Sequence, residues 1–289
     1  MLNKKRILVT GATGFVGNYV INELLKNNQY EIIATSRDSI KASQQKWFGK
    51  VQYLSYDINE NRSDIFNYFQ KPDILVHLAW EGLFNYNDVI HIEHNLMNHY
   101  FFLKNLITCG LNDINCVGTC FEYGIINGCL SEEMKTNPSN SYAIAKDCLR
   151  KFLEDLYKKL DFKYKWIRLF YMYGEGQSRK SLLSQVDKAI SNGDKIFNMS
   201  KGEQLRDYLE IKTVAEYIVK ISLQENVKGI INCASGIPIS IRALVENYLK
   251  NKNCIIELNL GYYDYPDYEP MAFWADTSKL NKILKDSSD

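Results

Sequence analysis

Three glycines near the N-terminus constrain this 289-residue chain more than any other feature of its sequence. Gly11, Gly14 and Gly17 follow a short apolar run, 6–10, and open a segment, 15–26, whose apolar residues recur at helical spacing. In such a strand–turn–helix the first glycine permits a tight turn, the second lets a pyrophosphate approach the backbone, and the third lets the helix pack on the strand. Free N–H groups at the helix start attract phosphate. The segment therefore predicts a dinucleotide-binding turn rather than a turn without a ligand.

The rest of the chain alternates short β-rich runs with longer helical patterns. Strands are predicted at 6–10, 31–35, 51–54, 73–78, 112–117, 164–170 and 229–233, and helices at 15–26, 88–109, 141–159, 182–192 and 211–223. Continuously apolar strands between helices indicate a parallel sheet covered on both faces. We expect an α/β fold built on a Rossmann-type doubly wound parallel sheet.

The regular alternation breaks down after Tyr171, which predicts a smaller C-terminal substrate lobe interleaved with the end of the sheet. We expect the dinucleotide-binding domain to comprise residues 1–170 and about 207–236. The substrate lobe is then expected to comprise about 171–206 and 237–289.

Composition excludes several classes of protein. Hydrophobic residues make up 46% of the chain and charged residues 24%, and the formal net charge is +1. A disordered chain has fewer apolar residues and a higher net charge, and a nucleic-acid-binding protein carries a basic surplus. The apolar run after Arg6 is too short for a signal peptide or a membrane span, so we expect a cytoplasmic protein with no membrane or nucleic-acid partner. Seven cysteines without a CxxC pair, and four histidines without zinc-ligand spacing, predict reduced thiols and no metal site.

The end of the second predicted strand bears on the form of the dinucleotide. A carboxylate at this point binds the 2′-hydroxyl of NAD. Ser36 and Arg37 stand here instead, and arginine offers a bidentate charged fork that suits a 2′-phosphate. The alternative is that Arg37 is a surface arginine and that Asp38 is the acid. We expect NADP(H), with NAD(H) as the alternative.

A YxxxK pair supplies the candidate chemistry. Tyr142 and Lys146 share one face of a predicted helix, and an ammonium beside a phenol favours the phenolate and so lowers the pKa of the phenol. Such a phenol donates and accepts protons near neutral pH. Thr119 follows the fifth predicted strand, where its hydroxyl suits a substrate carbonyl. We interpret all three as catalytic; the alternatives are a chance YxxxK among 20 tyrosines and a threonine that only caps a turn.

These motifs, in this order, resemble the extended branch of the short-chain dehydrogenase/reductase superfamily, and in particular its NAD(P)-dependent sugar-nucleotide epimerase/dehydratase group. The resemblance continues through the segments 117–124, 168–177, 205–215 and 232–242. It implies a set of cofactor-binding residues, which are Gly11, Thr13, Gly14, Phe15, Val16, Gly17, Ser36, Arg37, Asp57, Ile58, Leu78, Ala79, Trp80, Asn95, Tyr142 and Lys146.

The same resemblance implies that the substrate is a nucleotide-diphosphate sugar. Arg206 matches an arginine that approaches the diphosphate in relatives. The candidate substrate-binding residues are Trp80, Glu81, Thr119, Tyr171 and Arg206. The tail offers four tyrosines that either include a base-stacking group or simply pack there, namely Tyr262, Tyr263, Tyr265 and Tyr268.

A homodimer is also implied, because relatives pair the helices 88–109 and 141–159 in a four-helix bundle. Five residues either line this seam or face only the sheet, namely Leu96, Tyr100, Leu103, Leu149 and Leu156.

Cys120 and Phe121 narrow the reaction. Dehydratases of this family have an aspartate and a glutamate here, which eliminate water. Double epimerase/reductases use a cysteine and a histidine, but Cys120 is offset by one residue and no histidine follows His99. The segments around Thr119 and Trp80 resemble nucleotide-linked 4-keto-6-deoxy-sugar reductases. This implies NADPH-dependent reduction of the C4 keto group of a nucleotide-linked 4-keto-6-deoxyhexose, for deoxysugar and surface polysaccharide biosynthesis. An NAD-dependent C4 epimerase and a non-catalytic NADP(H)-binding protein are the alternatives.

Overall fold

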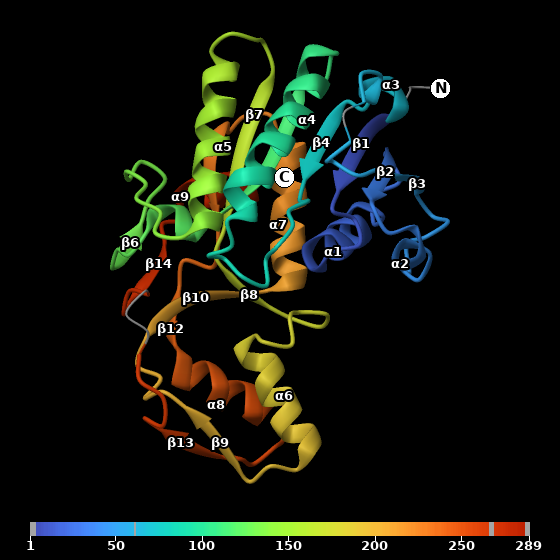
Figure 1. The fold of residues 1–289 in the computed structure, drawn as a ribbon. Coiled ribbons are helices and arrows are strands. Elements are labelled where there is room, and N and C mark those ends of the chain that lie inside the picture. Colours follow the sequence, from blue (N-terminus) through green and yellow to red (C-terminus); the bar gives the residue numbers. More distant parts are fainter. Residues whose placement is uncertain (1–3, 61, 266–268, 287–289) are drawn as a thin grey trace.

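A seven-stranded parallel sheet forms the centre of the computed structural model, which describes residues 4–60, 62–265 and 269–286 (Figure 1). The order of its strands is β11-β7-β5-β4-β1-β2-β3. They are β1 (Lys5–Thr10), β2 (Tyr30–Ser36), β3 (Gln52–Ser55), β4 (Ile74–His77), β5 (Asp113–Thr119), β7 (Lys163–Leu169) and β11 (Gly229–Cys233). The predicted Rossmann-type sheet is confirmed. Its direction of winding reverses between β1 and β4, which is where such sheets bind ligands.

Two layers of helices cover the sheet, because its strands are apolar on both faces. One layer consists of α1 (Phe15–Leu24), α2 (Ser39–Ser43), α7 (Ile211–Leu223) and α9 (Ser278–Asp286). The other consists of α3 (Ile65–Tyr68), α4 (Leu96–Thr108) and α5 (Ser141–Tyr157). Each layer buries its own apolar cluster against the sheet.

The predicted helix 88–109 begins with an irregular turn. Its first turn is the π-helix η1 (His91–Asn95), which continues directly into α4. The wider turn brings two buried side chains onto the loop after β4: His91 Nδ1 accepts from Trp80 Nε1 at 3.1 Å, and Asn95 Nδ2 donates to the Glu81 carbonyl at 3.2 Å. Single π turns of this kind are frequent at functional sites.

A small lobe lies below the sheet and has its own apolar core. Its helices are α6 (Leu182–Asn192) and α8 (Ile241–Asn251), and its strands are β9 (Ile196–Met199) and β13 (Glu257–Leu260). Two further sheets lie between it and the central sheet: β8 (Tyr171–Tyr173), β10 (Leu205–Glu210) and β12 (Pro238–Ser240) form one, and β6 (Gly128–Leu130) pairs with β14 (Phe273–Ala275) in the other.

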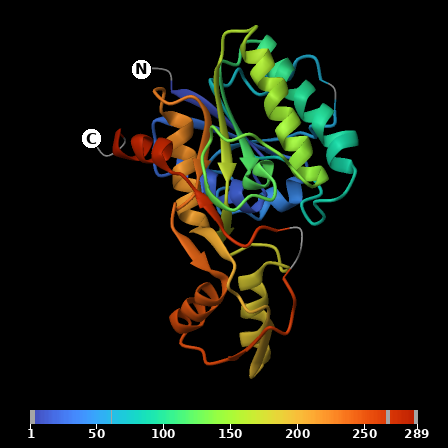
Figure 2. The same ribbon diagram turned by 90° about the vertical axis from the view of Figure 1, so that its left-hand side faces the viewer.

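The C-terminal helix corrects the expected boundary of the small lobe. The sequence assigns 237–289 to that lobe, but α9 lies beside α7 at the central sheet (Figure 2). Leu280 and Ile283 are each 1% exposed and belong to the same apolar cluster as α1 and α7. The described part of the chain thus returns to the large core after leaving the small lobe.

Of the two alternatives for the five residues considered for a dimer seam, the structure supports packing within the subunit. Leu96, Leu103, Leu149 and Leu156 are buried in the cluster between α4, α5 and the sheet, so they stabilise the subunit itself. Tyr100 packs against this cluster and is partly buried. Different residues lie on the outer faces of the two helices, and they include Met97, Phe101 and Phe152.

Two further findings concern the surface and the thiols. Within the described ranges, no helix is both long enough and apolar enough to cross a membrane. All seven cysteines are free, and Cys109 and Cys129 are exposed.

A chain of buried hydrogen bonds ties β1, β4 and α4 together beside the cleft. Thr10 Oγ1 accepts from the N–H groups of Leu78 and Ala79 at 3.2 and 3.3 Å. The Thr10 hydroxyl then donates its own proton to His77 Nδ1, at 2.9 Å. His77 Nε2 then donates to His99 Nδ1 at 2.7 Å. Burial lowers the pKa of His77 to about 3 and holds the pKa of His99 well below its usual value. Both imidazoles are therefore neutral at pH 7.

This histidine pair predicts how stability depends on pH. Folding lowers the pKa of His77 from 6.5 to about 3, so the unfolded chain binds more protons over this range. The free energy of unfolding therefore falls as the pH drops below about 6.5. One such histidine contributes a loss of about 2 kcal/mol between pH 7 and pH 5. We expect His99→Gln to reduce this loss, measured by urea unfolding at both pH values.

The matched control is His94→Gln, because His94 lies exposed on the same helical segment. This variant should keep the full pH dependence of the wild-type chain. Equal pH dependence in the two variants would contradict the assignment of neutral, buried imidazoles to the core.

Candidate active site

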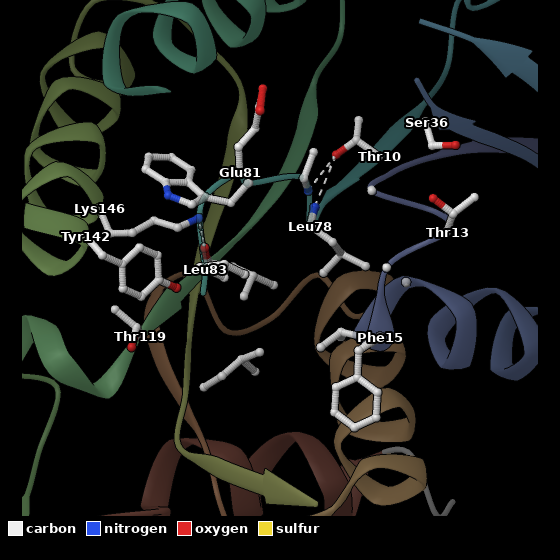
Figure 3. A pocket seen from close by; sticks show the side chains of 18 of the residues that line it. Thr10, Thr13, Phe15, Ser36, Leu78, Glu81, Leu83, Thr119, Tyr142 and Lys146 are labelled. Carbon is white, nitrogen blue, oxygen red and sulfur yellow. Dashed lines mark hydrogen bonds between the residues drawn. The ribbon is translucent and has the colours of Figure 1, made fainter. Parts of the chain in front are cut away.

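One cleft of about 930 Å³ lies at the C-terminal edge of the central sheet. It gathers most of the residues that the sequence predicts for the site. These are Gly11, Thr13, Gly14, Phe15, Val16, Gly17, Ser36, Arg37, Asp57, Ile58, Leu78, Ala79, Trp80, Glu81, Thr119, Tyr142, Lys146 and Tyr171. Figure 3 shows Tyr142, Lys146 and Thr119 across the cleft from Thr13 and Phe15 of the glycine turn.

The glycine turn is a cradle that side chains would fill. Gly11 has a φ of +68°, and a Cβ there would lie 2.7 Å from the backbone nitrogen of Ala79. A Cβ at Gly17 would overlap the carbonyl oxygen of Gly11. Helix α1 begins after Gly14 with no side chain capping it, so the N–H groups of its first turn remain available to phosphate. The turn therefore fits the pyrophosphate of a dinucleotide.

At the end of β2, Asp38 and Arg37 both line the cleft and both have partners. Asp38 Oδ1 accepts from the backbone N–H of Lys41 at 2.8 Å and caps helix α2. The Arg37 guanidinium donates to Glu81 Oε1 at 2.7 Å, and Asp57 Oδ2 lies 3.9 Å away. Glu81, which we expected in the sugar pocket, thus directs its carboxylate toward the β2 side of the cleft.

Thr119 and Tyr142 face one another at the opposite end. Thr119 ends β5 and caps the short helix η2 (Cys120–Tyr123), and its own N–H donates to Glu122 Oε1 at 2.9 Å. This capping box orients the threonine. Glu122 is fully buried, and its other oxygen accepts from Arg168 Nε at 2.7 Å. Glu122 is therefore a structural group with no free oxygen to offer a substrate.

The acidities of the catalytic pair differ from the sequence prediction. Lys146 was expected to lower the pKa of Tyr142, but burial raises it, and the hydrogen bond from Thr119 only partly offsets this. Burial also lowers the pKa of Lys146, to about 8. Near pH 7 the phenol of Tyr142 is protonated and the ammonium of Lys146 is still charged.

Lys146 is held between the sheet and an aromatic stack. Its Nζ donates to the Val117 carbonyl at 2.8 Å and lies 4.1 Å from the centre of the Trp80 ring. Trp80 in turn stacks on His99, with ring centres 4.6 Å apart. The neutral histidine pair therefore supports the tryptophan that contacts the ammonium.

Tyr86 is a site residue that sequence reasoning missed. Its ring stacks on Tyr142 with centres 5.2 Å apart, and its carbonyl accepts from the Tyr142 N–H at 2.9 Å. The aromatic wall continues through Phe121, 5.4 Å from Tyr86, to Tyr171, 6.0 Å from Phe121. Tyr86 lies in an irregular loop, and no local motif marks it.

Two predicted residues lie outside the cleft lining. Arg206 is 1% exposed, and its guanidinium donates to Glu269 Oε2 at 2.8 Å and lies 4.8 Å from the Phe273 ring centre. A diphosphate would have to displace this carboxylate. Asn95 is 2% exposed and reaches the cleft only through the Glu81 carbonyl.

The tail tyrosines do not join the cleft lining either, as far as the structure describes them. Tyr262 and Tyr263 are exposed and pack edge-to-face on each other with ring centres 4.8 Å apart. The Tyr265 hydroxyl donates to Glu203 Oε2 at 2.9 Å. Tyr268 falls outside the described residues.

Comparison with known proteins identifies the family and the fold. The profile of the NAD dependent epimerase/dehydratase family matches residues 7–234. The chain is 31% identical to dTDP-6-deoxy-L-talose 4-dehydrogenase (NAD(+)) of Aggregatibacter actinomycetemcomitans, over 93% of this chain and 98% of the relative. It is 25% identical to dTDP-4-dehydro-6-deoxyglucose reductase of Escherichia coli, over 88% and 84% respectively. A UDP-N-acetylglucosamine 4-epimerase structure from Methanobrevibacter ruminantium shares the fold, with a TM-score of 0.84 and 20% identity over 98% of this chain and 92% of that one.

The glycine turn generates a prediction with a matched control. Gly11 and Gly49 both have positive φ, but a Cβ at Gly49 would meet nothing within 4 Å. Gly49→Ala should lower the free energy of unfolding only by the backbone strain, about 1–2 kcal/mol. Gly11→Ala should lower the free energy of unfolding, measured with urea, by more than Gly49→Ala does, because its Cβ also clashes with the backbone of Ala79. It should in addition abolish the binding of a reduced nicotinamide dinucleotide, followed by fluorescence, which Gly49→Ala should retain. Equal effects of the two substitutions on binding would contradict the role of the turn.

Proposed function

This chain belongs to the NAD dependent epimerase/dehydratase family, and on that premise we propose that it reduces the C4 keto group of a nucleotide-linked 4-keto-6-deoxy sugar. It is an enzyme of the extended short-chain dehydrogenase/reductase type. The proposal concerns the reaction and the substrate class within that family. The relatives named for a C4 dehydrogenase and for a 4-keto-sugar reductase act on the same carbon in opposite directions.

One observation carries the proposal: the phenol of Tyr142 lies beside Thr119 and Lys146 in the cleft, next to an aromatic wall (Figure 3). Burial raises the pKa of Tyr142, so its phenol holds a proton to give. Cys120 lines the cleft, but burial raises the pKa of its thiol and keeps it protonated. One donor suffices for ketone reduction, whereas elimination of water or epimerisation beside a ketone needs a second acid–base group.

The residues have distinct roles in this reaction. The glycine turn and the N-terminus of α1 would hold the pyrophosphate of a nicotinamide dinucleotide, which when bound supplies a hydride to the carbonyl carbon. Thr119 positions the carbonyl oxygen by a hydrogen bond, and Tyr142 donates its proton to that oxygen as negative charge develops. Lys146 remains charged near pH 7 and stabilises the same charge.

The wall formed by Tyr86, Phe121 and Tyr171 supports a deoxy sugar as the substrate. These side chains form a continuous set of ring contacts that begins at Tyr142. The faces of these rings bind apolar groups, and only the hydroxyls of Tyr86 and Tyr171 could bond a sugar hydroxyl here. A methyl group at C6 suits this surface better than a hydroxymethyl group.

We propose NAD(H) as the cofactor, although the sequence alone favours NADP(H) because of Arg37. In the structure Arg37 is paired with Glu81 at 2.7 Å and lies 3.9 Å from Asp57. A 2′-phosphate here would meet a guanidinium that is already paired with a carboxylate. The name of the 31% identical relative also specifies NAD(+).

We propose a homodimer through the outer faces of α4 and α5. Phe101 is 55% exposed, and Met97 and Phe152 lie exposed on the same pair of helices. Apolar residues gathered on one face in this way indicate a protein–protein contact.

The proposed dimer predicts that Phe101→Lys shifts the wild-type dimer toward a monomer, measured by size-exclusion chromatography with light scattering. Ile255→Lys is the control, because Ile255 is 98% exposed and far from these helices in the fold. A monomeric wild-type chain, or a dimer insensitive to Phe101→Lys, would contradict the proposal.

The proposed reaction predicts that the protein consumes NADH when it is given a dTDP-, CDP- or GDP-linked 4-keto-6-deoxy sugar. The measurement is the loss of absorbance of the reduced nicotinamide, with the product sugar identified by NMR. Interconversion of two C4 alcohols without net NADH consumption would indicate an epimerase instead. Binding of the cofactor without turnover of any sugar would indicate a binding protein.

Tyr142→Phe tests the proton donor. We expect kcat to fall by roughly a hundredfold or more, the usual contribution of a positioned acid, with the fold unchanged by circular dichroism. Tyr157→Phe is the same substitution on the same helix, at an exposed position outside the cleft lining, and should keep full activity. A fully active Tyr142→Phe enzyme would overturn the mechanism.

A further inference from the structure

Arg37 and Glu81 form an ion pair between two loops, one after β2 and the other after β4, on either side of β1. Arg37 follows β2 and Glu81 lies in the loop after β4. Arg37 Nη1 donates to Glu81 Oε1 at 2.7 Å, and both residues line the cleft. Their side chains are 52% and 30% exposed, so the pair is weak by itself and open to a ligand that approaches from solvent.

Two asparagines contact Glu81, and a third supports one of them. Asn95 Nδ2 donates to the Glu81 carbonyl at 3.2 Å, and Asn59 Nδ2 donates to the same carboxylate oxygen that Arg37 contacts, at 3.1 Å. Asn98 Nδ2 in turn donates to Asn59 Oδ1 at 2.6 Å. These contacts orient the Glu81 carboxylate toward Arg37.

This end of the cleft is the adenosine end. It lies where β2 ends, one strand beyond the glycine turn, and a doubly wound sheet places the adenosine ribose at that point. The charged side chains lining it are Arg37, Lys41, Asp38, Asp57 and Glu81, which sum to a net charge of −1. A ribose 2′-hydroxyl is neutral, whereas a 2′-phosphate brings close to two negative charges into this surrounding.

We infer that Glu81 is a specificity-determining residue, which selects the 2′-hydroxyl form of the dinucleotide by occupying Arg37 and by repelling a 2′-phosphate. The inference rests on the proposed function, because it requires that the cleft bind a nicotinamide dinucleotide. Arg37 is a built-in phosphate ligand, and the carboxylate of Glu81 keeps it from acting as one.

The test compares the binding of NADH and NADPH to the full-length protein, with Kd measured by fluorescence titration in the absence of sugar. The wild-type chain should bind NADH more tightly than NADPH. Glu81→Gln keeps the shape of the side chain and removes its charge. This variant should bind NADPH at least tenfold more tightly than the wild type, while its Kd for NADH stays within about twofold.

Two further variants show whether the gain comes through Arg37. The double variant Glu81→Gln, Arg37→Gln should lose the tighter binding of NADPH, because the freed guanidinium is gone. Glu93→Gln removes an exposed carboxylate outside the cleft lining and should leave both Kd values unchanged. Thermal unfolding of each variant checks that the fold is retained.

The outcomes separate this inference from the proposed function. If both nucleotides bind but Glu81→Gln leaves the ratio of their Kd values within twofold, Glu81 is not the determinant. The same conclusion follows if the gain survives the loss of Arg37, or if the wild type already prefers NADPH. If neither nucleotide binds to the wild type, the proposed function fails and the inference fails with it.

Discussion

The close approach of two backbones, at Gly11 and Ala79, is the constraint on which the rest of this site depends. Strands β1 and β4 are neighbours at the point where the sheet reverses its winding, and the chain leaving β1 must turn directly over the chain leaving β4. The space between them excludes a Cβ at Gly11. The same contact positions the loop that carries Trp80 and Glu81. The glycine turn, the Trp80 ring beside Lys146 and the Arg37–Glu81 ion pair therefore all depend on it.

Buried polar groups position the reacting residues without taking part in the reaction. Glu122 accepts from the backbone of Thr119 and from the side chains of Trp166 and Arg168. A glutamate three residues after Thr119 would ordinarily be a candidate acid. Its oxygens are instead committed to partners in the core, because an unpaired buried carboxylate is costly. Its effect on chemistry is to fix the backbone of Thr119.

The acidities in the cleft set the resting protonation states of Tyr142 and Lys146. Burial raises the pKa of Tyr142 while it lowers the pKa of Lys146 to about 8. Both shifts have the same cause, since a low-dielectric site disfavours the charged form of each group. Before a cofactor binds, the phenol therefore carries the proton that a nascent alkoxide requires. The YxxxK spacing alone suggests the opposite shift for the tyrosine, because it shows the proximity of the ammonium and not the burial of the phenol.

The sequence by itself determined the sheet, the glycine turn and the catalytic pair. Each of these features follows from local periodicity or from a short spacing of residues. The seven strands accordingly lie within two residues of their predicted ends. One cleft brings together Gly11, Thr119, Tyr142 and Lys146. Only the tertiary structure decided the partners of the long charged side chains. Arg206 pairs with Glu269 rather than lining the cleft, Arg37 pairs with Glu81, and α9 returns to the central core. These contacts join segments far apart in the chain, and no local pattern encodes them, because they arise from packing after the strands have been brought together.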